Sequence, residues 1–143
     1  MQDFTVRQVK TQRELDQCID IRTQVFVIEQ NVPKNLEMDE FDIQAEHFLA
    51  HYNRIPIGCA RIRKDDCVKL ERIAILKSFR NKGFGKKLTK FLIQHCKRQR
   101  IKEICIHSQL SVKDFYRKFG FKKQGETFYE AGIEHIKMVL PLR

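Results

Sequence analysis

A strand-like segment, a glycine-containing turn and an amphipathic segment follow one another in the middle of the chain. The turn has the form R-x-x-G-x-G from Arg80 to Gly85, and lysines lie around it at positions 77, 82, 86 and 87. Free amides at a helix start attract anions, and glycine lets the backbone approach phosphate oxygens. The turn therefore predicts a pyrophosphate site, although a bare pair of glycines would also suit a plain tight turn.

Two better-known phosphate loops do not fit these positions. A dinucleotide fingerprint that starts at Gly83 needs glycine or alanine at position 88, where the chain has Leu88. A P-loop that ends at Gly85 needs glycine at position 80 and serine or threonine at position 87, where the chain has Arg80 and Lys87. Both motifs are excluded.

Length and composition limit the kind of protein. With 143 residues, of which 42% are hydrophobic and 32% charged, the chain predicts a single globular domain over 1–143. No stretch has the roughly eighteen apolar residues of a membrane-spanning helix, and the N-terminal segment lacks the apolar block of a secretory signal. The sequence therefore predicts a cytoplasmic protein without a membrane partner.

Net charge and cysteine content leave the function open. The formal charge of +10 favours a polyanionic partner, for which a nucleic acid and a phosphorylated cofactor both qualify. The cysteines are odd in number, widely spread and without a C-x-x-C pair, so we expect reduced thiols and no metal site. They are Cys18, Cys59, Cys67, Cys96 and Cys105.

The hydrophobic pattern predicts the elements that position the turn. Thr11 and Glu14 have the spacing of a capping box, so a helix is expected from there to about Val27. An acidic segment follows, which is expected to be a loop or a loop with one helical turn. Period-two and helical repeats predict the rest: strands over 4–10, 45–52, 57–63, 68–75, 102–107, 121–124 and 132–140, and helices over 85–98 and 111–119. This order predicts an α+β fold, with helices on the faces of a mixed sheet.

A second motif downstream of the turn extends the pattern. The turn, a following strand and the run F-Y-R-K-F-G-F at 115–121 together resemble the GNAT superfamily of acetyl-CoA-dependent acyltransferases, over about 4–140. The resemblance implies a twisted, mostly antiparallel sheet of about seven strands, splayed between the fourth and fifth. It also implies an N-acetyltransferase with acetyl-CoA as cofactor. The implied cofactor-binding residues are Ile73, Ala74, Ile75, Arg80, Asn81, Lys82, Gly83, Phe84, Gly85 and Lys86.

Direct acetyl transfer to an amine makes three chemical demands. It needs an uncharged amine, a donor for the developing oxyanion and a proton for the departing thiolate. The resemblance implies Tyr116 as the acid, with a packing aromatic as the alternative, and the Ile75 amide as a candidate oxyanion donor. Glu71, expected on the same strand face as Ile73, is a candidate base, and a carboxylate paired with lysine or arginine is equally compatible.

A narrower resemblance concerns the acceptor side. The runs at 22–33, 37–39, 45–47 and 128–138 resemble a bacterial subgroup called YjcF-like or ElaA-like. In this fold the first helix, the loop after it and the last strands border the acceptor groove, which implies an acidic site for a cationic amine. Pairing of these acids with nearby lysines is the alternative. The expected acceptor-side residues are Glu29, Glu37, Asp39, His47, His107, Glu130 and His135, of which both His107 and His135 are also alternative bases.

Three other functions stay open from the sequence. A nucleic-acid-binding domain would use the basic surface, but no known DNA- or RNA-binding motif accompanies the charge, so no nucleic-acid partner is expected. The acidic and arginine pattern between Arg22 and Asp42 is also similar to acyl-homoserine-lactone synthases, which lack this turn. A GNAT-fold module could bind acetyl-CoA without turnover. The sequence leaves open whether the acceptor is a small-molecule or a protein amine, and whether the chain forms a homodimer.

Overall fold

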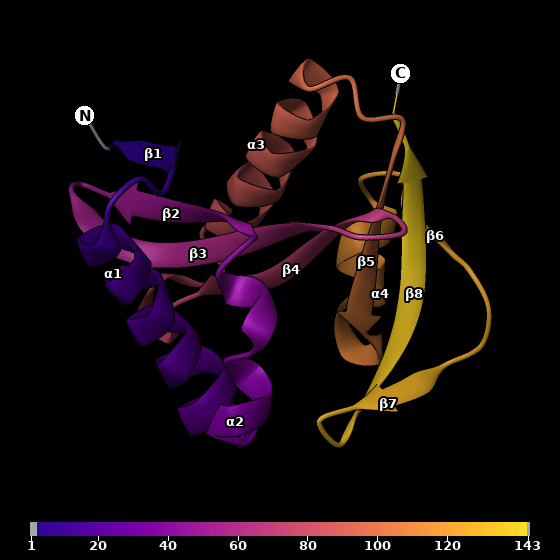
Figure 1. The fold of residues 1–143 in the computed structure, drawn as a ribbon, viewed down its shortest axis with the longest axis horizontal. Coiled ribbons are helices and arrows are strands. Elements are labelled where there is room, and N and C mark those ends of the chain that lie inside the picture. The colour runs from indigo at the N-terminus through magenta and orange to yellow at the C-terminus, as the bar shows by residue number, and fades with distance from the viewer. Residues whose placement is uncertain (1–2, 143) are drawn as a thin grey trace.

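The computed structural model describes residues 3–142, and Figure 1 shows how the elements are arranged. One eight-stranded sheet has the order β1-β2-β3-β4-β5-β8-β6, and β7 pairs with β8 outside this path. Neighbouring strands are antiparallel except β4 and β5, which are parallel. The predicted mixed, mostly antiparallel sheet is confirmed. The single domain over 1–143 stays a prediction, and its terminal residues 1–2 and 143 lie outside the described residues.

Apart from the short strand β7, the elements follow the predicted order. The strands are β1 (Phe4–Gln8), β2 (Glu46–Tyr52), β3 (Ile55–Lys64), β4 (Val68–Ile75), β5 (Glu103–Gln109), β6 (Lys122–Lys123), β7 (Phe128–Glu130) and β8 (Ile133–Pro141). The α-helices are α1 (Gln12–Arg22), α2 (Lys34–Glu37), α3 (Phe84–Arg98) and α4 (Lys113–Arg117). A π-helical segment, η1 (Thr23–Glu29), continues α1, and 3-10 turns η2 (Glu40–Asp42), η3 (Lys77–Phe79) and η4 (Leu110–Val112) lie in the connections.

The helix α1 begins where the capping box predicts. The Thr11 side chain accepts a hydrogen bond from the Glu14 amide, and the Glu14 carboxylate accepts from the Thr11 amide. The regular α-helix ends earlier than the expected Val27, because the chain changes to the wider π-helical winding at Thr23. The Thr23 hydroxyl donates 2.8 Å to the Ile19 carbonyl, a local bond that competes with regular helix geometry.

Helices cover both faces of the sheet. The larger core lies between one face and α3, which buries Leu88, Leu92 and Cys96 there. The smaller core lies on the opposite face, where α1 and η1 bury residues such as Ile21 and Val25. The α3 stripe is the one that its helical spacing predicts. The sheet therefore separates an α3 and α4 side from an α1 and α2 side, and the site lies where the sheet opens.

The strand β4 contains a bulge that changes which face its side chains occupy. Arg72 has a φ of 54°, and the β3–β4 register shifts between Cys59 and Arg61. As a result Glu71 and Arg72 both reach charged groups on the α1 side, whereas Ile73 packs with the core on the α3 side. The prediction that Glu71 shares a face with Ile73 is wrong, because the extra residue interrupts the two-residue alternation.

The sheet splays open between β4 and β5. Their parallel pairing covers only three residues on each strand, from Val68 with Ile104 to Leu70 with Ile106. Beyond it, β4 continues to Ile75 and β5 to Gln109 with no pairing between them. Figure 1 shows β1 to β4 on the left of the view and β5, β8 and β6 on the right. The predicted splay is confirmed.

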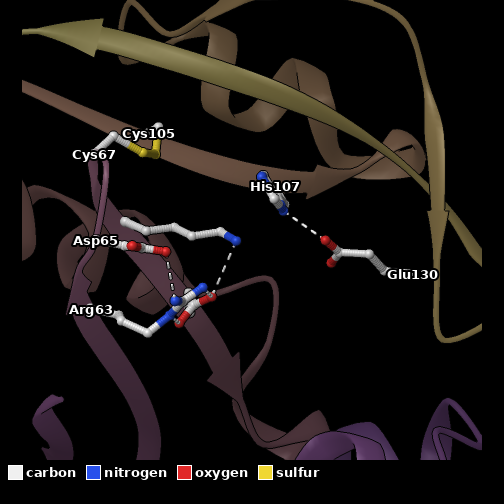
Figure 2. Close-up of a disulfide and its surroundings, with 8 residues drawn as sticks. Arg63, Asp65, Cys67, Cys105, His107 and Glu130 are labelled. Carbon is white, nitrogen blue, oxygen red and sulfur yellow. Dashed lines mark hydrogen bonds and ion pairs between the residues drawn. A yellow bond between two sulfur atoms is a disulfide. The ribbon is translucent and has the colours of Figure 1, made fainter. Parts of the chain in front are cut away.

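A disulfide lies at the closed end of the splay. Cys67 immediately precedes β4, and Cys105 lies on β5 opposite Lys69, so the parallel pairing brings two sequence-distant cysteines together (Figure 2). The expectation of reduced thiols is wrong for this pair. Spacing along the chain could not reveal a pairing that depends on strand neighbours. Cys18, Cys59 and Cys96 are free and buried.

A short hairpin near the C-terminus was not expected from the sequence. The strand β7 has three residues and pairs with the start of β8 around a turn at Ala131 and Gly132. Both turn residues have positive φ angles, of 50° and 76°. Such a turn is usually indicated by Asn-Gly, Asp-Gly or Gly-Gly, and Ala-Gly is a weaker signal.

None of the helices among the described residues is long and apolar enough to span a membrane.

Candidate active site

A cleft of about 880 Å³ passes through the splay of the sheet. Its lining comes from the open ends of β4 and β5, the start of α3, the helix α4, and the segments around α2 and the β7–β8 hairpin. Nearly all the predicted cofactor-binding positions line it; Lys82 does not. Both Tyr116 and Glu71 line it as well. The cleft therefore connects the turn from Arg80 to Gly85, the phosphate-type turn, with the candidate catalytic groups.

The turn before α3 presents unbonded backbone amides. Gly83 is the N-cap residue of α3 with a φ of 83°, and no side chain caps the helix. The first intrahelical bond runs from Lys87 to the Gly83 carbonyl, which leaves the first-turn amides for another acceptor. A Cβ built at Gly83 would meet no atom within 4 Å, so the space beside this residue of the turn is open. A phosphate group fits this arrangement.

Arg80, the first residue of the R-x-x-G-x-G turn, is bonded within the protein. Its Nε donates 2.8 Å to the Ile75 carbonyl, and its two terminal nitrogens each donate 2.8 Å to the Glu29 carboxylate. This bidentate pair ties the turn to the end of η1. Glu29, an expected acceptor-side residue, makes this contact and does not line the cleft.

The free edge of β4 presents backbone groups to the splay. The Leu76 amide donates to the Ile57 carbonyl of β3. Because peptide groups alternate along a strand, those of Ile73 and Ile75 point away from β3, toward the opening. The bond from Arg80 to the Ile75 carbonyl agrees with this direction. The amides of both residues can therefore donate to a molecule in the cleft.

Tyr116 lies on the α3 and α4 side of the cleft. Its ring is 8% exposed and packs edge-on against Phe115 and Phe121, at centroid distances of 5.0 and 5.9 Å. Its hydroxyl makes no hydrogen bond to another residue within 3–142. Burial raises the pKa of Tyr116, so the phenol stays protonated throughout the physiological range. The residue is packed like a core aromatic and still presents a proton donor to the cleft.

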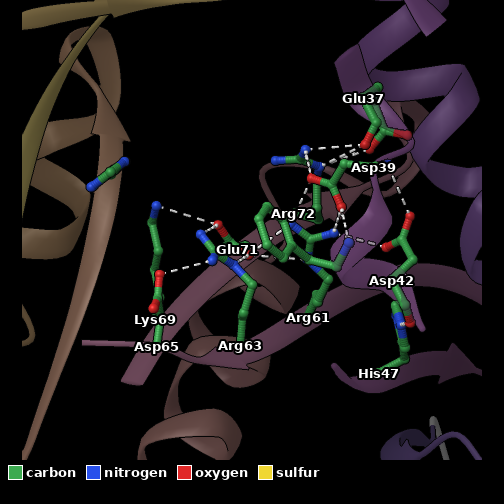
Figure 3. Close-up of polar contacts among 12 residues, drawn as sticks. Glu37, Asp39, Asp42, His47, Arg61, Arg63, Asp65, Lys69, Glu71 and Arg72 are labelled. Atoms are coloured by element: carbon green, nitrogen blue, oxygen red, sulfur yellow. Dashed lines mark hydrogen bonds and ion pairs between the residues drawn. The ribbon is translucent and has the colours of Figure 1, made fainter. Parts of the chain in front are cut away.

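A dense ion-pair cluster forms one wall on the opposite side of the sheet. Figure 3 shows arginines of β3 and β4 interleaved with carboxylates from the segment between α1 and β2. Arg61, 1% exposed, binds Asp39, Asp42 and Glu71 at 2.6 to 2.8 Å. The cluster consists of Arg22, Arg61, Arg63, Lys69 and Arg72 with Glu37, Asp39, Asp42, Asp65 and Glu71.

Glu71 is held by three cations of this cluster. Arg61, Arg63 and Lys69 lie 2.7, 3.0 and 3.4 Å from its oxygens. Burial alone would raise the pKa of Glu71, but the hydrogen bonds and charges of Arg63 and Arg61 lower it to about 2. A carboxylate with so low a pKa is a weak proton acceptor. The geometry favours the ion-pair reading of Glu71 over the base.

Three other expected acceptor-side residues belong to the same cluster or lie behind it. Glu37 binds Arg22 and Arg72 through Oε2, and Asp39 binds Arg61 and Arg72. Both line the cleft, with their charges compensated. His47 does not line it; its Nε2 lies 2.8 Å from the Asp42 carbonyl in a buried position. Glu37 and Asp39 thus line the cleft as ion-paired carboxylates, whereas Glu29 and His47 lie outside its lining.

The wall formed by β5, β7 and β8 carries the remaining expected residues. His107 on β5 and Glu130 on β7 form a pair with 2.7 Å between Nδ1 and Oε1 (Figure 2). The hydrogen bond from His107 is the main cause that lowers the pKa of Glu130. His135 on β8 is buried, with Nδ1 2.7 Å from the Ile133 carbonyl. All three line the cleft.

The residues that hold the two walls in place carry no recognisable signal in the sequence. Arg61, Arg63 and Arg72 organise the ion-pair cluster, yet on the sequence they resemble solvated residues of alternating strands. A bridge from Gln109 Nε2 to Gln30 Oε1, 2.8 Å long, joins β5 to the end of η1. The residues are 79 positions apart, so no local signal could have found the contact.

Comparisons with known proteins agree with this geometry. Residues 3–142 match the family described as Acetyltransferase (GNAT) domain. A Bacillus subtilis protein named as an acetyltransferase is 38% identical over 139 residues, which are 94% of this chain and 95% of that protein. The crystal structure of Escherichia coli ElaA has a TM-score of 0.85 and 26% identity, and the match covers 97% of this chain and 99% of that one.

A further solved structure bears on the cleft. A GNAT family acetyltransferase from Elizabethkingia anophelis, solved with acetyl-CoA bound, has a TM-score of 0.75 and 22% identity, over 97% of this chain and 98% of that one. At this identity the likeness concerns the fold. The predicted GNAT fold and the predicted resemblance to ElaA-like proteins are confirmed. The chain belongs to the acetyltransferase (GNAT) domain family.

Proposed function

We propose that this acyltransferase binds acetyl-CoA in the cleft and transfers the acetyl group to a primary amine. The observation that carries the proposal is the continuity of the cleft: it leads from the uncapped start of α3 through the splay to Tyr116. A thioester at the splay would then meet strand amides and a phenol in the same space.

The start of α3 fits the pyrophosphate of the cofactor. The amides from Asn81 to Lys86 would hold its oxygens, helped by the helix dipole and nearby lysines. A Cβ added at Gly85 would lie 3.8 and 3.9 Å from Phe115 and Ile75, which is ordinary contact, so the packing of the protein alone does not require glycine there. The pantetheine arm would pair with the free edge of β4 at Ile73 and Ile75.

The protein groups in the splay match the demands of acetyl transfer. The cofactor supplies an activated acetyl thioester. The Ile75 amide would donate to the developing oxyanion, and Tyr116 would give its proton to the departing sulfur; both residues line the cleft. Because burial raises the pKa of Tyr116, its proton is present at any working pH.

The acceptor and the cellular location are the less specific parts of the proposal. We propose a small-molecule or protein amine, which would enter from the α1 and α2 side, and a cytoplasmic location. Cell fractionation tests the location.

Calorimetry and a turnover assay test the function together. We expect saturable binding of acetyl-CoA at one site, and release of free thiol that depends on one member of a panel of amino sugars, polyamines, amino acids and peptides. Binding without thiol release would indicate a module without turnover. Retention by DNA or heparin, together with no acetyl-CoA binding, would contradict the proposal and favour a nucleic-acid-binding protein.

A further inference from the structure

The base for the attacking amine has few candidates in this cleft. On the β4 wall, Glu71, Asp39 and Glu37 are each bonded to two or more cations. Taking a proton would cost each carboxylate these ion pairs. The remaining Glu37 oxygen is fully buried and has no partner among the described residues, so an amine cannot reach it without rearrangement. The carboxylates of the β4 wall therefore stabilise the fold through ion pairs and are poorly suited to accept a proton from the amine.

The β5 wall holds a group suited to accept a proton. The strand alternation places His107 on the face of β5 opposite to Ile106, which packs in the core on the α3 side. Its ring lies edge-on to Phe128, at 4.9 Å between centroids, and its side chain is 25% exposed in the cleft. The ring is thus oriented by contacts and still accessible.

The partner of His107 determines which ring nitrogen is free. An ionised carboxylate can only accept hydrogen bonds, so at 2.7 Å from Glu130 the Nδ1 atom of His107 carries the proton. In the neutral ring, Nε2 then has the lone pair. The pair has the arrangement of a base and its orienting carboxylate, with the carboxylate contributed by the β7–β8 hairpin.

We propose that His107 is the catalytic base that takes the proton of the attacking amine, and that Glu130 is the positioning residue that fixes its tautomer. The proposal rests on the acetyl transfer proposed above. It places the base on the α1 and α2 side of the splay and the acid, Tyr116, on the α3 and α4 side. The amine and the departing thiolate would thus exchange protons with separate groups on opposite sides of the thioester.

The proton and electron balance of the step is complete. The amine nitrogen lone pair forms the new C–N bond while a proton passes from that nitrogen to Nε2 of His107. The carbonyl π electrons move to oxygen and then return as the C–S bond breaks, and the sulfur takes the Tyr116 proton. His107 then loses its proton to water and the Tyr116 phenolate regains one, so that an amide and a free thiol are the products.

The first measurement compares His107→Gln with wild type, using acetyl-CoA and the amine that gives turnover in the panel. We expect kcat/KM to fall about a hundred- to ten-thousandfold, as for loss of a general base, while the acetyl-CoA dissociation constant stays within twofold. The acidic limb of the kcat/KM pH profile that belongs to the base should disappear. Groups that influence this limb are Glu130 from β7, His135 and Lys137 from β8 and, across the cleft, Lys69 and Glu71 from β4.

A second variant tests the positioning role. Glu130→Gln can donate to Nδ1 through its amide and so move the proton to Nε2, the wrong tautomer for a base. We expect a loss of at least about tenfold in kcat, and a change of the His107 tautomer in 15N NMR spectra of histidine-labelled protein. One matched control is Glu126→Gln, which makes the same substitution at an exposed position in the loop before β7. The other is His51→Gln on β2. Both variants should have near wild-type activity.

Three results would overturn the proposal. If His107→Gln keeps activity within about threefold of wild type, the base is another group and the proposed acetyl transfer stands. A wild-type His107 that carries its proton on Nε2 would exclude the role of Glu130. If the wild-type protein does not bind acetyl-CoA, both this proposal and the proposed function fail, which distinguishes the two cases.

Discussion

The wall of the cleft built on β3 and β4 holds five cations and five carboxylates that are bonded to one another, whereas the wall built on β5, β7 and β8 holds His107 with Glu130. In the first wall most groups have several partners, so a change of protonation there would break several contacts. In the second, one hydrogen bond orients a ring that keeps a free nitrogen. Charged residues that line the same cleft thus differ in what they can do, according to how many partners they have.

The largest expected effect concerns the acid on the α4 side. Tyr116→Phe keeps the ring and its packing against Phe115 and Phe121 and removes only the hydroxyl. We expect kcat to fall about a hundred- to ten-thousandfold, with the acetyl-CoA dissociation constant and the melting temperature near wild type. Steady-state kinetics and calorimetry measure these. A fall of less than about threefold would make Tyr116 a packing residue.

Removing the central cation of the β3–β4 wall should change stability most. Arg61→Met removes the cation that Asp39, Asp42 and Glu71 share, although each of the three carboxylates keeps another cation of the cluster. Breaking a buried ion pair from one side costs about 3–5 kcal/mol of unfolding free energy. Urea denaturation measures the loss. The control, Arg117→Met, removes an exposed pair with Asp114 and should change the free energy by less than about 0.5 kcal/mol. Equal effects would mean that the cluster contributes little.

The phosphate-type turn gives a smaller, separable effect. Gly83→Val introduces a side chain at a φ of 83°, and Gly125→Val does so at 81°, with open space at both positions. Both variants should therefore lose similar stability, on the order of 1–3 kcal/mol. Only Gly83→Val should weaken acetyl-CoA binding, by about tenfold or more, because it adds a side chain at the N-cap of α3, next to the free amides proposed to hold the pyrophosphate. Equal affinities of the two variants, measured by calorimetry, would show that Gly83 only shapes a turn.

Acidic pH should lower the stability that the ion pairs of the β3–β4 wall contribute. Burial raises, but the arginines lower, the pKa of Glu71 and of Asp42, to about 2 for each, below their unfolded values of 4.5 and 3.8. A carboxyl with a depressed folded pKa contributes stability above its unfolded pKa and loses it as pH falls toward the folded value. We expect the melting temperature to decline from about pH 4.5 to about pH 2.

The variant Glu71→Gln sharpens this last test. It should be less stable than wild type at pH 7 and lose less stability on acidification, because one of the titrating groups is gone. At neutral pH its kcat should stay within about threefold of wild type, well below the loss expected for a base. A loss of a hundredfold or more would return the base to the β4 wall and contradict the comparison of the two walls.

The sequence alone determined the order of elements and the position of the turn. The capping box at Thr11 and Glu14, the apolar stripe of α3 and the glycines at 83 and 85 are local signals, because their physical basis lies within a few residues. Family membership followed from the turn and the F-Y-x-x-x-G-F run. These patterns located the cofactor side before any contact was known.

Only the tertiary structure decided which polar residues are free. The bulge at Arg72 moved Glu71 to the face of the arginines, and the parallel neighbours β4 and β5 brought Cys67 to Cys105. Arg61, Glu37, Asp39 and Asp42 look solvated on the sequence. Folding buries Arg61 and Glu37 and half-buries the two aspartates beside them. Side-chain partners depend on register and strand order, which join residues far apart in the chain, so the state of each candidate group could not be derived from spacing.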